Sequence, residues 1–156
     1  MIHAILVKNS NLYYYQGFHD FVSVFFLTLG ENLGFYCADA ASRFFIKDCM
    51  LESFEHGIIP ALNLIMKLLK EVDLDVYNMI ESGSFGQPTF TLSWVLTWYS
   101  HDILFFNQVQ RVFDACLSQH PMFTLYMAVA TIMHNRERLE ELYDEDDPQT
   151  SLYMVF

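Results

Sequence analysis

Two adjacent histidine–aspartate pairs are the first residues in this sequence whose types and spacing suggest chemistry. His19 is followed by Asp20, and His101 is followed by Asp102. Imidazole nitrogens and carboxylate oxygens bind divalent metal ions, and some metal-dependent phosphohydrolases hold their ions with such pairs on helices. The alternative is structural, because an aspartate in the first turn of a helix satisfies free backbone N–H groups and the helix dipole.

The other histidines do not extend either pair into a metal centre. A metal site needs several ligands to converge, and no two of these histidines have the i, i+4 spacing that places two imidazoles on one helix face. The phosphate-binding motifs G-x-x-x-x-G-K-[ST] and G-x-G-x-x-G are absent, as are H-E-x-x-H and G-x-S-x-G. We therefore predict neither a metal site nor a cofactor. The histidines outside the pairs are His3, His56, His120 and His134.

A run of aromatic and polar residues at 13–20 is the second candidate for chemistry. It reads Tyr-Tyr-Tyr-Gln-Gly-Phe-His-Asp, and the neutral Gln16 stands where an apolar helix is about to begin. The residues by themselves favour an aromatic patch at the edge of the core. In that interpretation Gln16 makes a hydrogen bond to a neighbouring backbone group, since most polar residues at helix starts are caps.

The elements that must position these residues are predicted to be helices. Residues 18–29 carry apolar side chains at i, i+3, i+4, i+7, i+8 and i+11, with Val24 and Leu27 on the other side. This pattern predicts a helix that is buried almost all round and ends at Gly30. No alternation with period two is long enough for a sheet, so the fold class is all-α. Further helices are expected over 32–46, from Pro60 onward, over 75–81, over 90–99, over 105–116 and from Pro121 to Met133, with a loop at 83–88.

Composition limits the class of protein. The chain has 156 residues, of which 53% are hydrophobic and 17% charged, so it is predicted to be a folded domain with a substantial core. A formal net charge of −11 argues against nucleic acid or an anionic membrane surface as the main partner. No membrane-spanning segment is predicted, because the best candidate, 122–133, is too short. Three widely spaced cysteines indicate buried, reduced thiols.

Acidic residues are concentrated near the C-terminus. They predict a helix whose last turns run into solvent, followed by a solvated acidic tail. The expected domain boundaries are therefore residues 1–141 for the folded domain and 142–156 for the tail. The acidic residues in question are Glu137, Glu140, Glu141, Asp144, Glu145, Asp146 and Asp147.

The order of several motifs resembles that of the TBC-type Rab GTPase-activating domains. Tyr14-Tyr15-Gln16-Gly17 matches the Y-x-Q-G motif of that family, and residues 14–30 look most like the subgroup associated with the endoplasmic reticulum and early secretory Rabs. The helical residues after the loop at 83–88, here called the second block, are similar to that subgroup's Ser-Trp…Thr-Trp…His segment and its Arg-hydrophobic-aromatic-Asp motif. The resemblance extends to about residue 141. The later motifs are carried by Trp94, Trp98, His101, Arg111 and Asp114.

This resemblance implies both a fold and a mechanism. The fold would be a multi-helix orthogonal array, with 1–141 forming roughly the C-terminal two-thirds of a TBC domain. The chain would act in trans on a GTP-bound Rab, where Gln16 orients the attacking water. Tyr14 would support the Gln16 side chain, and Gly17 would allow the tight turn that directs Gln16 toward the nucleotide. Asp20 belongs to the same motif. Such a protein regulates a GTPase and is not itself an enzyme; its expected location is the cytoplasm, at the cytosolic face of the endoplasmic reticulum or Golgi.

One family feature has no match here. TBC domains supply an arginine from an I-x-x-D-x-x-R motif upstream of the glutamine, and no arginine precedes Tyr14 in this sequence. Three interpretations follow: a truncated GTPase activator of impaired activity that keeps the Gln16 half-site, a non-catalytic Rab-binding or helical interaction module, and an unrelated helical scaffold. The motif order argues against the third. Incomplete cover of the helix at 18–29 also predicts self-association through exposed apolar surface.

Overall fold

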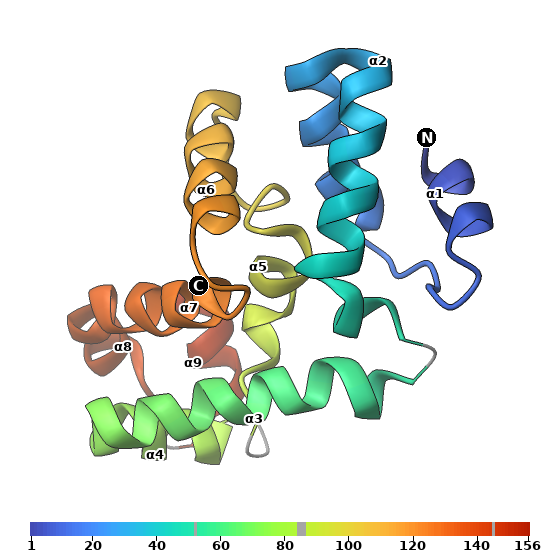
Figure 1. The fold of residues 1–156 in the computed structure, drawn as a ribbon. Coiled ribbons are helices and arrows are strands. Elements are labelled where there is room, and N and C mark those ends of the chain that lie inside the picture. Colours follow the sequence, from blue (N-terminus) through green and yellow to red (C-terminus); the bar gives the residue numbers. More distant parts are fainter. Residues whose placement is uncertain (52, 84–86, 145) are drawn as a thin grey trace. The chain divides into compact units, whose positions relative to one another are not determined.

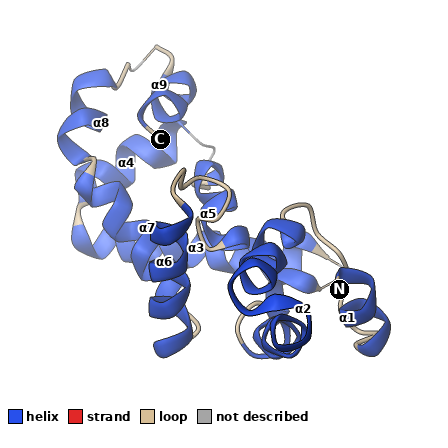
Figure 2. Ribbon diagram, turned by 90° about the horizontal axis from the view of Figure 1, so that it is seen from above, coloured by secondary structure: helices blue, strands red, loops and turns tan. Residues whose placement is uncertain are grey.

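The computed structural model describes residues 1–51, 53–83, 87–144 and 146–156. Every regular element in those residues is a helix (Figures 1 and 2), which confirms the predicted all-α class. The chain divides into two compact units, one formed by Met1–Ile59 and Ser93–Thr124 and the other by Pro60–Leu92 and Leu125–Phe156. Residues 84–86 of the predicted loop lie outside the described residues.

In the first unit, α1 (Ile2–Lys8) precedes a long helical hairpin, α2 (Phe18–Phe44). The backbone of α2 breaks at Gly30, where φ is 75° and ψ is 179°, so the chain turns back and the two arms run side by side (Figure 1). A Cβ at Gly34 would lie 2.8 Å from the Phe25 carbonyl oxygen of the first arm. Glycine at this position therefore lets the arms approach closely, and the predicted helix end at Gly30 is confirmed.

The prediction that residues 18–29 are buried almost all round is wrong. Phe18, Phe21 and Phe25 are buried, whereas Leu27 is 65% exposed and Phe26 is 46% exposed. Only the inner face of this arm packs on the core of the first unit, so an apolar residue on the opposite face keeps its contact with solvent.

Length and apolar composition make α2 resemble a membrane-spanning helix, whereas the sequence pattern had given residues 122–133 as the best candidate. Its 27 residues include a window of mean hydropathy 1.4, and no other helix in the described residues is both long and apolar enough to cross a membrane. The break at Gly30 divides it into two arms, each shorter than the ~20 residues that a spanning helix needs. The same segment supplies much of the core of the first unit, which is the simpler reason for its composition.

Aromatic rings form that core. The ring centroids of Phe21 and Trp98 are 5.0 Å apart, and Phe113 lies 5.2 Å from Trp98 and 5.4 Å from Phe21. Trp98 follows α5 (Leu92–Thr97), and Phe113 belongs to α6 (Phe106–Ser118). Trp98 has φ of 50° and Tyr99 has φ of 64°, a left-handed conformation that bulky residues rarely adopt. Burial of both rings holds this turn, which places the following residues beside the start of α2.

A buried carboxylate fastens α1 to the second arm of α2. The side chain of Asp39 is 3% exposed and accepts hydrogen bonds from Lys8 Nζ at 2.7 Å, Asn9 Nδ2 at 2.7 Å and Arg43 at 3.2 Å. Burial alone would raise the pKa of Asp39, but the hydrogen bonds from Lys8 and Asn9 and the charge of Arg43 outweigh it and lower the pKa. Asp39 is therefore held as a carboxylate inside the unit.

The next long helix, α3 (Phe54–Val72), begins earlier than the sequence predicts. Pro60 was expected to open it but lies inside it. Ser53 provides the actual start, because its Oγ accepts a hydrogen bond from the Glu55 N–H at 3.2 Å. An internal proline close to the beginning of a helix removes one backbone hydrogen bond, and the remaining turns are long enough to keep the helix.

The second unit contains α4 (Leu74–Gly83), α8 (Arg136–Leu142) and α9 (Pro148–Val155), and most of α7 (Phe123–His134). Helix α9 corrects the prediction of a solvated tail at the C-terminus. It packs on α4 and α8, with Leu152 buried, and a Cβ at Gly83 would lie 2.8 Å from the Leu152 side chain. Apolar residues at the end of the chain thus fold back, although acidic residues precede them. The boundary at residue 141 remains a prediction.

The shorter elements are two 3₁₀ turns, Lys47–Met50 and Thr89–Thr91. The first follows α2 directly, and the second leads into α5. Cys116 is buried and Cys37 and Cys49 are half-buried, and all three are free thiols, as predicted. Burial raises the pKa of the Cys49 thiol to about 12, so this group is protonated at neutral pH.

Candidate functional site

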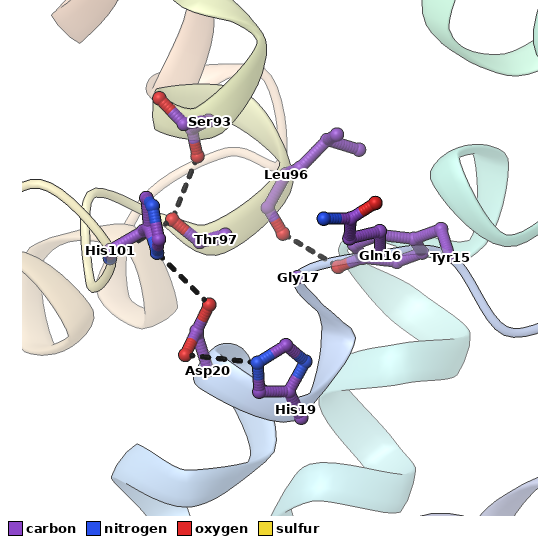
Figure 3. A pocket seen from close by; sticks show the side chains of 9 residues that line it. All are labelled: Tyr15, Gln16, Gly17, His19, Asp20, Ser93, Leu96, Thr97 and His101. Carbon is purple, nitrogen blue, oxygen red and sulfur yellow. Dashed lines mark hydrogen bonds and ion pairs between the residues drawn. The ribbon is translucent and has the colours of Figure 1, made fainter.

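A pocket of about 500 Å³ lies in the first unit, between the start of α2 and the segment formed by α5 and the turn after it (Figure 3). The two sides come from residues about 80 positions apart in the chain. Every residue that the Y-x-Q-G motif predicted to be functional, except Tyr14, lines it. The lining residues are Tyr15, Gln16, Gly17, His19, Asp20, Ser93, Leu96, Thr97 and His101.

Gln16 presents its side chain to solvent at this pocket. The residue is exposed, and among the described residues its amide has no hydrogen-bond partner. The interpretation of Gln16 as a backbone cap is therefore wrong. The aromatic patch is also less buried than that interpretation required, because Tyr13 is 47% exposed and Tyr14 is 51% exposed. A free primary amide at the edge of a pocket can still donate and accept hydrogen bonds from a ligand.

The residues on either side of Gln16 are fixed. The hydroxyl of Tyr15 donates a hydrogen bond to the Leu96 carbonyl at 2.6 Å, and burial raises the pKa of Tyr15 well above its ordinary value. Gly17 has φ of 108°, and a Cβ there would lie 3.0 Å from Thr97 Cγ2. Glycine is thus required both by the backbone conformation and by the close approach of α5.

Three members of the histidine–aspartate pairs, His19, Asp20 and His101, line the same pocket. Asp20 Oδ2 lies 3.3 Å from His101 Nδ1, and Asp20 Oδ1 lies 3.5 Å from His19 Nε2. The other ring nitrogen of His19 lies 3.1 Å from the Tyr14 hydroxyl. Within the described residues, no group of three or more His, Cys, Asp or Glu side chains has the arrangement of a metal site. The contacts that the structure shows in this cluster are those of Asp20 with the two imidazoles and of His19 with the Tyr14 hydroxyl.

The structural interpretation of the two aspartates holds for one of them. Asp20 lies in the first turn of α2, as predicted. Asp102 lies in the turn after α5 instead, where it accepts a hydrogen bond from Ser93 Oγ at 2.9 Å. Burial raises the pKa of Asp102, and the Ser93 hydrogen bond and nearby His101 oppose that shift only in part.

The second-block residues have separate places in the first unit. His101 reaches the pocket, whereas Trp94 and Trp98 are buried in the core. Arg111 and Asp114 form an exposed ion pair of 3.2 Å on α6 and do not line the pocket. Sequence analysis missed Ser93, Leu96 and Thr97 as lining residues. Their i, i+3, i+4 spacing on a short helix is the signal that could have found them.

No arginine or lysine appears among the described residues that line the pocket. Each arginine of the chain has another partner. Arg43 pairs with Asp39 at 3.2 Å and Arg111 with Asp114 at 3.2 Å. Arg136 lies 2.7 Å from Asp73, and Arg138 donates to the Met154 carbonyl at 3.3 Å. Histidine side chains are consequently the basic groups at this pocket.

Comparison with known proteins places these features in a family context. The family profile described as the Rab-GTPase-TBC domain matches residues 1–140. TBC1 domain family member 20 from Bos taurus and from Homo sapiens are each 31% identical over 156 residues, covering 98% of this chain and 37% of each relative. The GTPase-activating protein gyp10 of Schizosaccharomyces pombe is 31% identical over 142 residues, covering 91% of this chain and 38% of that protein. The chain thus spans little more than a third of the length of these relatives.

Proposed function

The chain belongs to the Rab-GTPase-TBC domain family, and from that premise we propose that it is an activator of Rab GTPases in which Gln16 enters the nucleotide site in trans. The observation that carries this proposal is the free, exposed amide of Gln16. A glycine turn and a tyrosine hydrogen bond fix the residues on either side of it. A side chain that must leave its own protein to act in another is expected to be solvent-exposed on a rigid backbone.

The chemistry fits a primary amide. In GTP hydrolysis a water attacks the γ-phosphoryl group, the bond to the β-phosphate oxygen breaks, and charge spreads over the phosphoryl oxygens. The Gln16 carbonyl oxygen would accept a hydrogen bond from the water while its NH₂ donates to a phosphoryl oxygen. Holding the water in line with the leaving group accelerates the reaction by orientation and needs no proton transfer to Gln16.

The proposed partner is a GTP-bound Rab. Support comes from the family itself and from relatives whose names describe GTPase-activating proteins. In this role the chain regulates the catalysis of another protein and has no independent reaction. The similarity of residues 14–30 to the early secretory subgroup supports a cytoplasmic location at the cytosolic face of the endoplasmic reticulum or Golgi.

Residues 1–156 are proposed to supply only part of the catalytic machinery. An arginine finger contributes about 10³–10⁵ in rate to an activated GTPase, because its guanidinium stabilises charge on the phosphoryl oxygens. The described pocket has no arginine, and neutral Gln16 carries no net positive charge. Arg43 cannot replace the finger while it pairs with Asp39. These residues alone are therefore expected to accelerate hydrolysis little.

Single-turnover hydrolysis by GTP-loaded Rabs of the early secretory pathway tests the proposal. We compare the 156-residue chain with a version that carries the family's I-x-x-D-x-x-R segment ahead of residue 1. The extended protein should be active, and Gln16→Ala in it should lower the rate by about 100-fold, the order expected when a reacting group is misplaced. Gln108→Ala, which removes another exposed glutamine of the first unit, is the matched control. Equal activity of the two variants would remove the role of Gln16.

A non-catalytic Rab-binding or helical interaction module is the second candidate. The absence of arginine and lysine from the described lining of the pocket favours it, and so does the exposed apolar surface of the first unit. Leu104 is 86% exposed, Leu27 65% and Phe105 60%. Binding of GTP-loaded Rab without acceleration by either version would support this function. The same side chains support the proposal of self-association, which sedimentation velocity at several concentrations would test.

A further inference from the structure

Gln16 lies between two attachments that join its loop to a single segment, residues 96–101. On one side, the Tyr15 hydroxyl donates to the Leu96 carbonyl, which we call the tyrosine attachment. On the other side, Asp20 pairs with His101, which we call the aspartate attachment. Figure 3 shows both interactions as dashed lines. Each joins a residue of α2 or the loop before it to a residue of α5 or the turn after it.

The tyrosine attachment is neutral and permanent. Its 2.6 Å hydrogen bond joins a half-buried phenol to a backbone carbonyl. Because burial raises the pKa of Tyr15, the phenol keeps its proton at every physiological pH. This side of the loop therefore does not respond to protonation.

The aspartate attachment is exposed and made of titratable groups. The side chain of Asp20 is 28% exposed, and those of His101 and His19 are 66% and 54% exposed. The Asp20–His101 distance is 3.3 Å, and the interaction is an ion pair only while the imidazole carries its proton. Solvent reaches all three groups, so the strength of this side of the loop follows the pH of the surroundings.

The backbone connects Asp20 firmly to the glutamine. The Gly17 carbonyl accepts hydrogen bonds from the Asp20 N–H at 3.0 Å and from the Phe21 N–H at 3.3 Å. The Phe18 N–H donates to the Tyr15 carbonyl at 3.1 Å, across Gln16 itself. A shift of the first turn of α2 relative to His101 is consequently transmitted to Gly17 and to the backbone of Gln16.

We propose that His101 is a positioning residue for Gln16, acting through Asp20, and that its protonation sets how firmly the glutamine is held. Other titratable groups face the same pair: His19 on α2, Tyr14 and Tyr15 on the preceding loop, and Asp102 beside His101 on the turn. Among them, the contacts of the two histidines with Asp20 are the ones that become ion pairs only when an imidazole is protonated. The attachment is strongest when protonated His101 faces ionised Asp20, and it loosens when the imidazole loses its proton.

The geometric part of the proposal is tested on the free chain by nuclear magnetic resonance. The backbone amide signals of Gln16 and Gly17 should shift between pH 5 and 8 with the midpoint of the His101 ring signals. His101→Asn keeps an N–H donor near the position of Nδ1 without the titration, so it should abolish that shift. His134→Asn alters an exposed histidine of the second unit and should leave the shift intact. Flat Gln16 signals, or a shift that disappears in His19→Asn but persists in His101→Asn, would overturn the proposal.

The consequence for activity rests on the proposed function and is measured separately, in the extended protein. His101→Ala should lower the rate of GTP hydrolysis at saturating activator by about 10-fold, with an unchanged concentration for half-maximal effect, because a misplaced group costs orientation and not affinity. His101→Asn should keep the activity at pH 6 but lose the decline toward pH 8. A merely structural His101 would alter stability and leave the pH profile unchanged. Inactivity of the unmodified extended protein would refute the activator function while leaving the resonance result to decide the positioning role.

Discussion

Helix α2 carries two aspartates with opposite surroundings, Asp39 on its second arm and Asp20 in its first turn. Asp39 is almost fully buried and faces permanent donors, since Lys8, Asn9 and Arg43 all bond to its oxygens. Asp20 is partly exposed and faces two histidines. The same residue type on the same helix thus has two roles. The charge of Asp39 is fixed by its donors, whereas the interactions of Asp20 depend on the protonation of its histidine partners.

The contrast separates a structural carboxylate from one placed to influence a site. Asp39 joins the end of α1 to the second arm of α2 through its ion pairs with Lys8 and Arg43. Loss of its charge would leave these two cations without this partner. Asp20 lines the same pocket as Gln16, and in our proposal its weaker interaction with His101 biases the position of the glutamine loop. Stability and function are therefore expected to respond to different members of this pair.

Replacing Asp39 should produce the largest loss of stability. Asp39→Ala removes three hydrogen bonds to a buried charge, and we expect a decrease of about 2–3 kcal/mol in the free energy of unfolding. The value is below that of a fully buried pair because Lys8 and Arg43 are 50% and 41% exposed and regain water. Urea unfolding measures it. Asp20→Ala is the matched control, expected within 0.5 kcal/mol of the parent by the general behaviour of exposed pairs; equal losses would erase the distinction drawn between the two sites.

Substitution of the two glycines that shape α2, Gly17 and Gly30, should also separate an effect on function from an effect on stability. Gly17→Ala places a side chain at φ of 108°, 3.0 Å from Thr97 Cγ2, whereas Gly30→Ala at φ of 75° meets nothing within 4 Å. Both carry backbone strain of about 1–3 kcal/mol, and only Gly17→Ala adds a steric contact and should reduce GTPase stimulation. Thermal unfolding reports the first effect, and single-turnover hydrolysis with the extended protein reports the second. The double variant Gly17→Ala/Thr97→Ser should recover the steric part alone, so full recovery would contradict the role of the backbone conformation.

Lowering the pH should remove part of the contribution of Asp39 to the free energy of unfolding, and this loss should be smaller than that of Asp39→Ala. Its pKa is lowered in the folded protein, so its contribution to stability is present above the unfolded value of about 3.9 and disappears as the pH falls through the folded value. Asp39→Asn should therefore flatten the decline of unfolding free energy as the pH falls below about 4. The pKa of Asp73 in the second unit is also lowered, chiefly by its hydrogen bond from Arg136, so Asp73→Asn should flatten the curve independently. A variant curve parallel to that of the parent protein would show that Asp39 is not held as a carboxylate.

Local sequence pattern predicted the helices more reliably than their limits or their exposure. The end of the first arm at Gly30 follows from glycine's conformational freedom, and the structure confirms it. The start of α3 could not be read from Pro60, because Ser53 caps the helix about two turns earlier. The return of α9 onto α4 depends on the surface of a distant helix, about which the acidic composition of the C-terminal segment contains no information.

What the sequence by itself determined was the residue types of the candidate site: an amide at Gln16, a glycine able to turn beside it and a carboxylate one helical turn later. Their motif also identified the family to which the chain belongs. Only the tertiary structure decided that the Gln16 amide has no partner among the described residues, that Asp20 faces His101, and that Leu96 and Thr97 complete the pocket. The reason is physical: a side chain's identity fixes the interactions that it can make, but its partners come from segments some 80 residues away that packing of the Phe21, Trp98 and Phe113 rings brings beside it.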